Sequence, residues 1–187
     1  MARQKNEWLD WIKALIIAGL LAFIVRMFFF APIVVDGPSM MPTLLDEDHM
    51  IVNKFSYTIG EPERFDIVVF HATANKDYIK RVIGLPGETV AVKNDTLYIN
   101  DKPIDEPFLN EKKQQLVENQ RYTFDFTMED IPGDNQRIPE DHVLVLGDNR
   151  GNSTDSRSQS LGLISYDQIV GKTGLRYWPL NQIGIVN

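Results

Sequence analysis

Residues 77–88 read DYIKRVIGLPGE, and residues 78–83 form a short apolar run interrupted by two adjacent cations. The run is bounded by a turn-forming Gly-Leu-Pro-Gly stretch, which predicts a β-strand that ends near residue 83. Alternate side chains of a strand share a face. Tyr78, Lys80 and Val82 are therefore predicted on one face, and Arg81 on the other.

Lys80 is the unusual member of this predicted strand, because lysine is rarely buried on an apolar face. Burial disfavours the charged ammonium, so such a lysine loses its proton nearer to neutral pH. A neutral amine can act as a general base and accept a proton from a serine hydroxyl. The alternative is a lysine at a strand edge whose side chain extends to water.

The body of the chain after residue 32 has a mainly β pattern. Short apolar segments alternate with polar turns, and a polar segment of residues 101–139 is predicted to form peripheral short strands and loops. The predicted fold class is an antiparallel or mixed β-sheet. The predicted strands, besides residues 78–83, are residues 66–71, 89–92, 96–100, 122–126, 142–146 and 169–172.

Ser39 lies in the stretch VVDGPSMMPTLL, residues 34–45, between two prolines. Pro38 restricts the backbone before Ser39, and Pro42 limits any helix after it. The stretch therefore predicts a rigid loop that carries a hydroxyl group. Taken alone, Ser39 is compatible both with an ordinary turn and with a nucleophile.

A polar loop follows the predicted strand 142–146. Residues 147–157 read GDNRGNSTDSR and combine acids, arginines and hydroxyl side chains. Arginine beside aspartate favours fixed, hydrogen-bonded ion pairs, although a solvated polar loop is the simpler interpretation. A calcium loop is disfavoured, because Arg150 and Arg157 interrupt the acids and the spacing does not fit an EF-hand.

Residues 14–31, ALIIAGLLAFIVRMFFFA, contain one charge, Arg26. As a helix the segment would span about 27 Å, near the thickness of a bilayer core. A transmembrane anchor is the favoured interpretation; a cleaved signal peptide and a buried helix are the alternatives. Arg3, Lys5 and Lys13 precede the segment, which predicts a cytoplasmic N-terminus and an extracytoplasmic body.

The composition excludes several functional classes. The 187-residue chain has a net charge of -7 and no long basic block, so nucleic acid is not an expected partner. It has no cysteine, and no HExxH or CxxC pattern, so no metal or other cofactor is predicted. His71 and His142 lie at strand ends without a sharp motif, so a Ser-His-Asp triad remains an alternative to Ser39 with Lys80.

Taken together, these segments resemble type I signal peptidases, the membrane-bound Ser-Lys proteases of family S26 that remove signal peptides from exported proteins. The resemblance rests on the order and spacing of SMMPTL (39–44), DIVVF (66–70), YIKRVIGLPGE (78–88) and GDNR (147–150) with the serine, acids and arginine that follow. It covers the chain from the predicted anchor to about residue 172. The single anchor and the short segment 101–139 look like the compact Gram-positive enzymes.

The resemblance implies a role for each matched residue. Ser39 would be the acylating nucleophile, Lys80 the general base, and Ser153 the group that orients the Lys80 amine. Met40 and Met41 would form an apolar surface near lipid. The polar loop would be braced by Asp148, Asp155, Arg157 and Arg81, and the substrate pockets, which take small side chains, would be walled by Ile33, Val35, Leu44, Tyr78 and Ile79.

One position departs from the pattern of part of the family. Some members carry a serine two residues before the nucleophile, whose hydroxyl helps to bind the oxyanion, and this chain has Gly37 there. The backbone N–H of Ser39 would remain as the main donor. Loss of one such donor costs roughly 3–4 kcal/mol in other enzymes, so a compensating feature is expected.

The predicted organisation is a cytoplasmic N-terminus (1–13), a membrane anchor (14–31) and an extracytoplasmic catalytic domain (32–187). Its expected partners are the signal peptides of preproteins and membrane lipid. Two other functions compete with this one. They are a self-cleaving repressor of the same fold, disfavoured by the anchor and by the lack of a DNA-binding region, and a non-catalytic peptide-binding β-domain.

Overall fold

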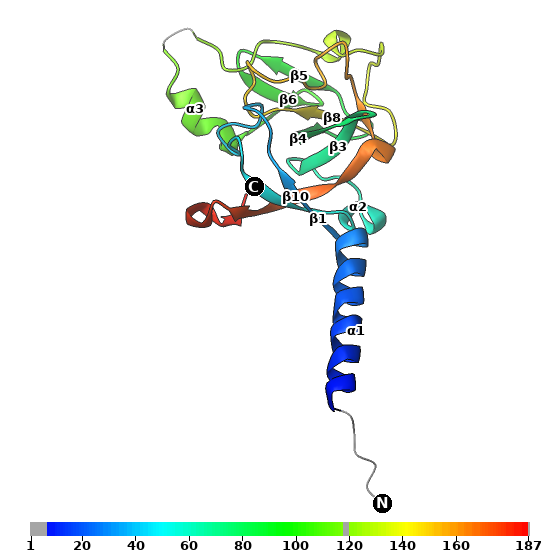
Figure 1. The fold of residues 1–187 in the computed structure, drawn as a ribbon. Coiled ribbons are helices and arrows are strands. Elements are labelled where there is room, and N and C mark those ends of the chain that lie inside the picture. Colours follow the sequence, from blue (N-terminus) through cyan, green and yellow to red (C-terminus); the bar gives the residue numbers. More distant parts are fainter. Residues whose placement is uncertain (1–6, 118–119, 187) are drawn as a thin grey trace, which may run out of the picture.

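The computed structural model describes residues 7–117 and 120–186, and its body is built on antiparallel β-sheets (Figure 1). The larger sheet has the strand order β1-β2-β10-β3-β4-β8-β9, with β11 paired to β10. The prediction of a mainly antiparallel β fold is confirmed. The strands are β1 (Phe30–Val34), β2 (His49–Asn53), β3 (Ile67–Thr73), β4 (Lys76–Gly84), β8 (His142–Leu146), β9 (Ile164–Ser165), β10 (Ile169–Trp178) and β11 (Gly184–Ile185).

Strand β4 lies between β3 and β8, so both of its edges are hydrogen-bonded, and each of its two faces packs against an apolar cluster. Val82 packs into a cluster with Val68, Phe70 and Val145. Ile83, on the opposite face, packs into a second cluster that includes residues of the smaller sheet. This arrangement explains how two adjacent cations, Lys80 and Arg81, are both buried at 3% and 1% exposure, because each one points into a different layer.

The smaller sheet has three strands, β5 (Val90–Lys93), β6 (Thr96–Ile99) and β7 (Lys102–Ile104). The segment that follows carries helix α3 (Asn110–Gln114). The prediction of a strand at residues 122–126 is wrong, since only a single bridge joins Phe126 to Val92. The reason is a long-range contact: the Tyr122 and Thr123 amides donate to the carboxylate of Asp95 instead of to a neighbouring strand.

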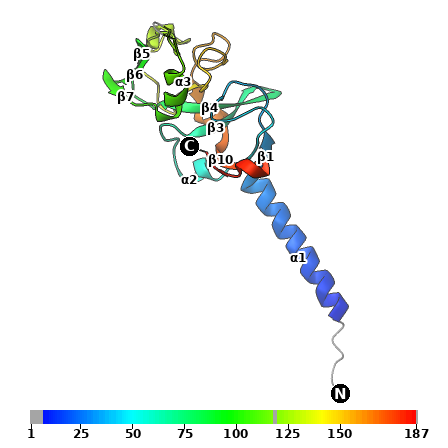
Figure 2. The ribbon, with the colours of Figure 1, turned by 90° about the vertical axis from the view of Figure 1, so that its left-hand side faces the viewer.

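Helix α1 (Glu7–Phe28) extends away from the β body in both views (Figures 1 and 2). Its large apolar side chains, such as Trp11 at 72% and Leu15 at 70% exposure, face outward. Across residues 7–117 and 120–186, no helix combines the length and hydropathy needed to cross a membrane. The basic residues Arg3 and Lys5, used to predict the orientation, lie outside the described residues.

Residues at the end of the predicted anchor belong to a strand. Helix α1 ends at Phe28, and β1 begins at Phe30 and pairs with β2. Strand β1 is the edge of the larger sheet. Pro32 is tolerated there because an edge strand does not need every backbone N–H for pairing. A short helix, α2 (Ser56–Ile59), follows β2.

Candidate active site

Ser39 and Lys80 are in direct contact. The Nζ atom of Lys80 lies 2.8 Å from the Oγ atom of Ser39, and Nζ also donates to the carbonyl oxygen of Ile79 at 2.8 Å. Burial lowers the pKa of Lys80 from 10.5 to about 8, although the carboxylates of Asp155 and Asp148 act in the opposite direction. A substantial fraction of the amine is therefore neutral slightly above neutral pH, in position to accept the serine proton.

The loop that carries Ser39 is held by its own turns and by two buried side chains. The Met41 amide donates to the Pro38 carbonyl and the Leu44 amide to the Met40 carbonyl. Met40 and Leu44 are both fully buried and pack in one cluster with Val35. Met40 is thus part of the core, so the prediction that it forms an apolar surface is wrong.

Gly37 adopts a left-handed backbone conformation with φ of +94°, which glycine tolerates better than any residue with a side chain. Its amide donates to the carboxylate of Asp46 at 2.8 Å. Among the described residues, no acceptor is found for the amide N–H of Ser39. The Ser39 amide is consequently an available backbone donor next to the hydroxyl.

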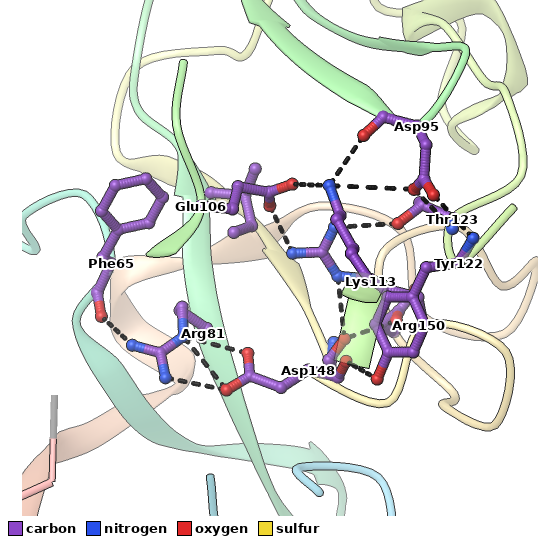
Figure 3. Close-up of polar contacts among 12 residues, drawn as sticks. Phe65, Arg81, Asp95, Glu106, Lys113, Tyr122, Thr123, Asp148 and Arg150 are labelled. Atoms are coloured by element: carbon purple, nitrogen blue, oxygen red, sulfur yellow. Dashed lines mark hydrogen bonds and ion pairs between the residues drawn. The ribbon is translucent and has the colours of Figure 1, made fainter. Parts of the chain in front are cut away.

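The first acid of the polar loop connects three elements. Asp148 accepts hydrogen bonds from Nε and Nη2 of Arg81 at 2.9 and 2.8 Å, and Figure 3 shows this pairing. The Thr43 hydroxyl donates to the same carboxylate at 2.5 Å. The backbone N–H of Asn149 donates a hydrogen bond to the carbonyl oxygen of Ser39 at 3.0 Å. The polar loop, strand β4 and the Ser39 loop are therefore joined around one buried carboxylate.

The second acid of the polar loop, Asp155, is fully buried and pairs with Arg157 at 2.7 Å. It also accepts the Gly147 amide at 3.1 Å. Ser153 lies beside Gly147, and its hydroxyl oxygen is buried with no hydrogen-bond partner among the described residues. The hydrogen bond from Ser153 to Lys80 that the resemblance implies is thus not formed in this structure.

A cavity of about 390 Å³ opens beside Ser39 and Lys80. Four of the five predicted pocket residues line it, whereas Leu44 is buried in the core beneath the loop. Val69 was missed by the sequence analysis, although it pairs with Ile79 across β3 and β4. The lining includes Ile33, Val35, Tyr78 and Ile79 together with Asp36, Gly37, Val69, Asn152 and Thr154.

The two histidines considered as alternatives have other partners. His71 Nδ1 lies 2.6 Å from the carboxylate of Asp77, and the pair is exposed. His142 Nδ1 lies 2.8 Å from the carbonyl of Glu140. Because the hydroxyl of Ser39 is hydrogen-bonded to Lys80, the geometry favours lysine over histidine as its base.

Comparison with known proteins identifies the family. Residues 8–178 match the family described as "Signal peptidase, peptidase S26". The chain belongs to family S26, the signal peptidases. The chain is 48% identical over 186 residues to signal peptidase I of Bacillus caldolyticus, covering 97% of each chain. It is 45% identical to signal peptidase IB of Staphylococcus aureus (strain Mu50 / ATCC 700699), covering 95% of this chain and 93% of the relative.

A solved structure supports the fold of this family S26 serine peptidase. The crystal structure of a signal peptidase I from Enterococcus faecalis V583 is 41% identical and superposes with a TM-score of 0.56. The match covers 61% of this chain and 97% of the solved one. The prediction of a family S26 enzyme with a β fold is therefore confirmed by sequence and by structure.

Proposed function

We propose that this protein cleaves N-terminal signal peptides from exported preproteins through a Ser39–Lys80 dyad and an acyl-enzyme. The observation that carries the proposal is the 2.8 Å contact between Ser39 Oγ, which is partly exposed, and Nζ of Lys80, which is 3% exposed. A nucleophile within hydrogen-bond reach of its base is the geometry required for this chemistry. The names of the relatives, signal peptidase I and IB, support the substrate class.

In the proposed reaction, neutral Lys80 takes the Ser39 proton as Oγ forms a bond to the scissile carbonyl carbon. The tetrahedral intermediate collapses when Lys80 returns that proton to the leaving amine and the C–N bond breaks. A water molecule, deprotonated in turn by Lys80, then attacks the ester carbonyl. The peptide acid leaves, and the proton returns to Ser39 Oγ.

The negative oxygen of the tetrahedral intermediate needs hydrogen-bond donors. We assign this role to the amide of Ser39, since the Gly37 amide is engaged by Asp46. A backbone donor is fixed before the reaction, so it stabilises charge as that charge develops. A feature that compensates for the missing serine at position 37 was expected, and the described residues do not show one.

Substrate side chains would enter the cavity beside Ser39. Ile33 and Val35 come from β1 and the residues after it, and Tyr78 and Ile79 come from β4. Apolar walls close to the nucleophile favour apolar side chains before the cleavage point, and the family resemblance implies that these side chains are small. We propose structural roles for the remaining predicted residues: Arg81, Asp148, Asp155 and Arg157 hold the polar loop, and Ser153 orients the Lys80 amine when substrate is bound.

We also propose that the protein is attached to the cell membrane through α1, with the body on the extracytoplasmic side where preproteins emerge. Contiguous exposed apolar side chains mark interaction or membrane sites. Those of α1 are exposed along most of its length. Flotation of the full chain with lipid vesicles is the expected result, and a chain that stays with the soluble fraction would contradict membrane attachment.

The catalytic proposal is tested by incubating a purified preprotein in detergent with wild type, Ser39→Ala and Lys80→Ala. We expect cleavage by wild type and none by either variant, while circular dichroism shows that both remain folded. Asp125→Asn, which changes an exposed acid, serves as the control and should cleave normally. Near-normal cleavage by Lys80→Ala would reject the Ser-Lys mechanism.

A further inference from the structure

A buried acid outside the predicted site contacts the polar loop from the segment 101–139. Glu106 is 5% exposed, and its Oε1 accepts a hydrogen bond from Nη2 of Arg150 at 2.5 Å. Lys113 Nζ lies 3.5 Å from the other oxygen of Glu106. Figure 3 shows dashed lines from the carboxylate of Glu106 to both cations. Charges buried in this way are costly unless paired, so the geometry around Glu106 is narrowly determined.

The same segment contacts the polar loop at a second point. Lys113 donates to the carbonyl of Asp95 at 2.7 Å, and the Asp95 carboxylate accepts the amides of Tyr122 and Thr123. The Tyr122 hydroxyl then donates to the carbonyl of Asp148 at 2.9 Å. One connected set of hydrogen bonds thus links the polar loop to the turn between β5 and β6, to helix α3 and to residues 122–123.

Arg150 connects these contacts to the part of the polar loop that lies next to Ser39. Its Nε donates to the carbonyl of Gly147 at 3.1 Å, and its Nη1 donates to the Thr123 hydroxyl at 3.3 Å. A side chain at Gly147 would begin only 2.5 Å from the carbonyl oxygen of Ser39. Asn149, between Gly147 and Arg150, donates its amide to that same carbonyl. The loop therefore lies directly against the backbone of Ser39.

We propose that Glu106 is a positioning residue, which fixes Arg150 and so holds residues 147–150 against the backbone of Ser39. The inference rests on the proposed function, and it assigns to the segment 101–139 a part in the reaction. A guanidinium that bonds a carboxylate, a hydroxyl and a carbonyl at once has one permitted orientation. Misplacement of a catalytic group by about 1 Å can cost about 100-fold in rate.

The kinetic test uses Glu106→Gln, which keeps the shape of the side chain and removes its charge. We expect kcat for preprotein cleavage to fall about tenfold with KM within about twofold of wild type, because the substrate cavity is untouched. Glu129→Gln, the same change at an exposed acid of the same segment, should leave both constants unchanged. A loss of kcat that only follows the folded fraction, measured by thermal denaturation, would show a merely structural role and overturn the inference.

A double mutant identifies the path. Arg150→Lys keeps the charge but cannot make all three contacts. If Glu106 acts through Arg150, the variant Glu106→Gln/Arg150→Lys should be no slower than Arg150→Lys alone. If the fold-losses in kcat of the two single variants multiply in the double variant, Glu106 acts independently of Arg150, and the inference is overturned.

Amide hydrogen exchange tests the same coupling without any turnover. Exchange at Asn149, whose amide donates to Ser39, should be faster in Glu106→Gln than in wild type and in Glu129→Gln. Unchanged exchange at Asn149 would overturn the inference. Failure of the proposed function and failure of the proposed role of Glu106 can therefore be told apart. If the wild type cleaves no preprotein, the proposed function is rejected. The exchange rate at Asn149 still decides whether Glu106 positions the polar loop.

Discussion

The hydroxyl of Thr43 donates to the carboxylate of Asp148, 105 residues further along the chain. Arg81 binds the same carboxylate from strand β4, next to Lys80. Asp148 is fully buried. One acid thus holds both the loop that carries the proposed nucleophile and the strand that carries its proposed base.

Thr43→Val should separate the loop from Asp148 while keeping nearly the same volume. We expect a loss of about 1 kcal/mol in the free energy of unfolding, the net value of one hydrogen bond. We also expect kcat to fall about tenfold, since the position of the Ser39 loop is less well fixed. Urea denaturation and steady-state kinetics measure the two effects, and an unchanged kcat would count against the link from Thr43 to Ser39.

Asp148→Asn should destabilise the protein strongly. It removes the carboxylate that neutralises Arg81, a cation with 1% exposure. Breaking a buried ion pair from one side costs about 3–5 kcal/mol. The matched control is Asp125→Asn, which breaks the exposed pair with Arg121 and should cost about 0–1 kcal/mol. Similar losses for the two variants in urea denaturation would contradict this account of the site.

Lys80→Met should be more stable than wild type at pH 7. Burial lowers the pKa of Lys80 to about 8 in the folded protein, so charging the folded lysine opposes folding by about 3 kcal/mol. The cost is fully present below pH 8 and is lost as pH rises towards 10.5. The stability difference measured by urea denaturation should therefore shrink between these pH values, and a difference that grows there would be inconsistent with a buried, depressed lysine.

Gly37→Ser tests whether the missing hydroxyl can simply be restored. The φ of +94° at this position strains any residue that has a side chain, at a cost of roughly 1–2 kcal/mol. We expect lower stability and no gain in kcat. An increase in kcat would show that the hydroxyl reaches the oxyanion and that the Gly37 conformation adapts to it.

The sequence predicted the features that depend on local patterns. The placement of Lys80 and Arg81 on opposite faces follows from the alternation of side chains along one strand, and the structure confirms that both are buried. The contact between Lys80 and Ser39 was expected only through the family resemblance. No spacing along the chain encodes a pairing of residues 41 positions apart.

Long-range packing accounts for what the sequence analysis missed. The family resemblance implied an apolar surface near lipid at Met40, but the loop turns inward and buries its side chain. Glu106 gave no signal, because a single acid in a polar segment does not differ in pattern from its solvated neighbours. Its partner Arg150 is 44 positions away. The strand expected at residues 122–126 failed because the Asp95 carboxylate captures its amides.

The role of Lys80 as the base is tested most directly by the pH dependence of a single turnover, in which excess enzyme acylates on a preprotein. The neutral amine is the active form, so the rate should rise with pH through a midpoint of about 8, the pKa that burial gives Lys80. A midpoint near 6.5, the ordinary value for histidine, would contradict the Ser39–Lys80 mechanism.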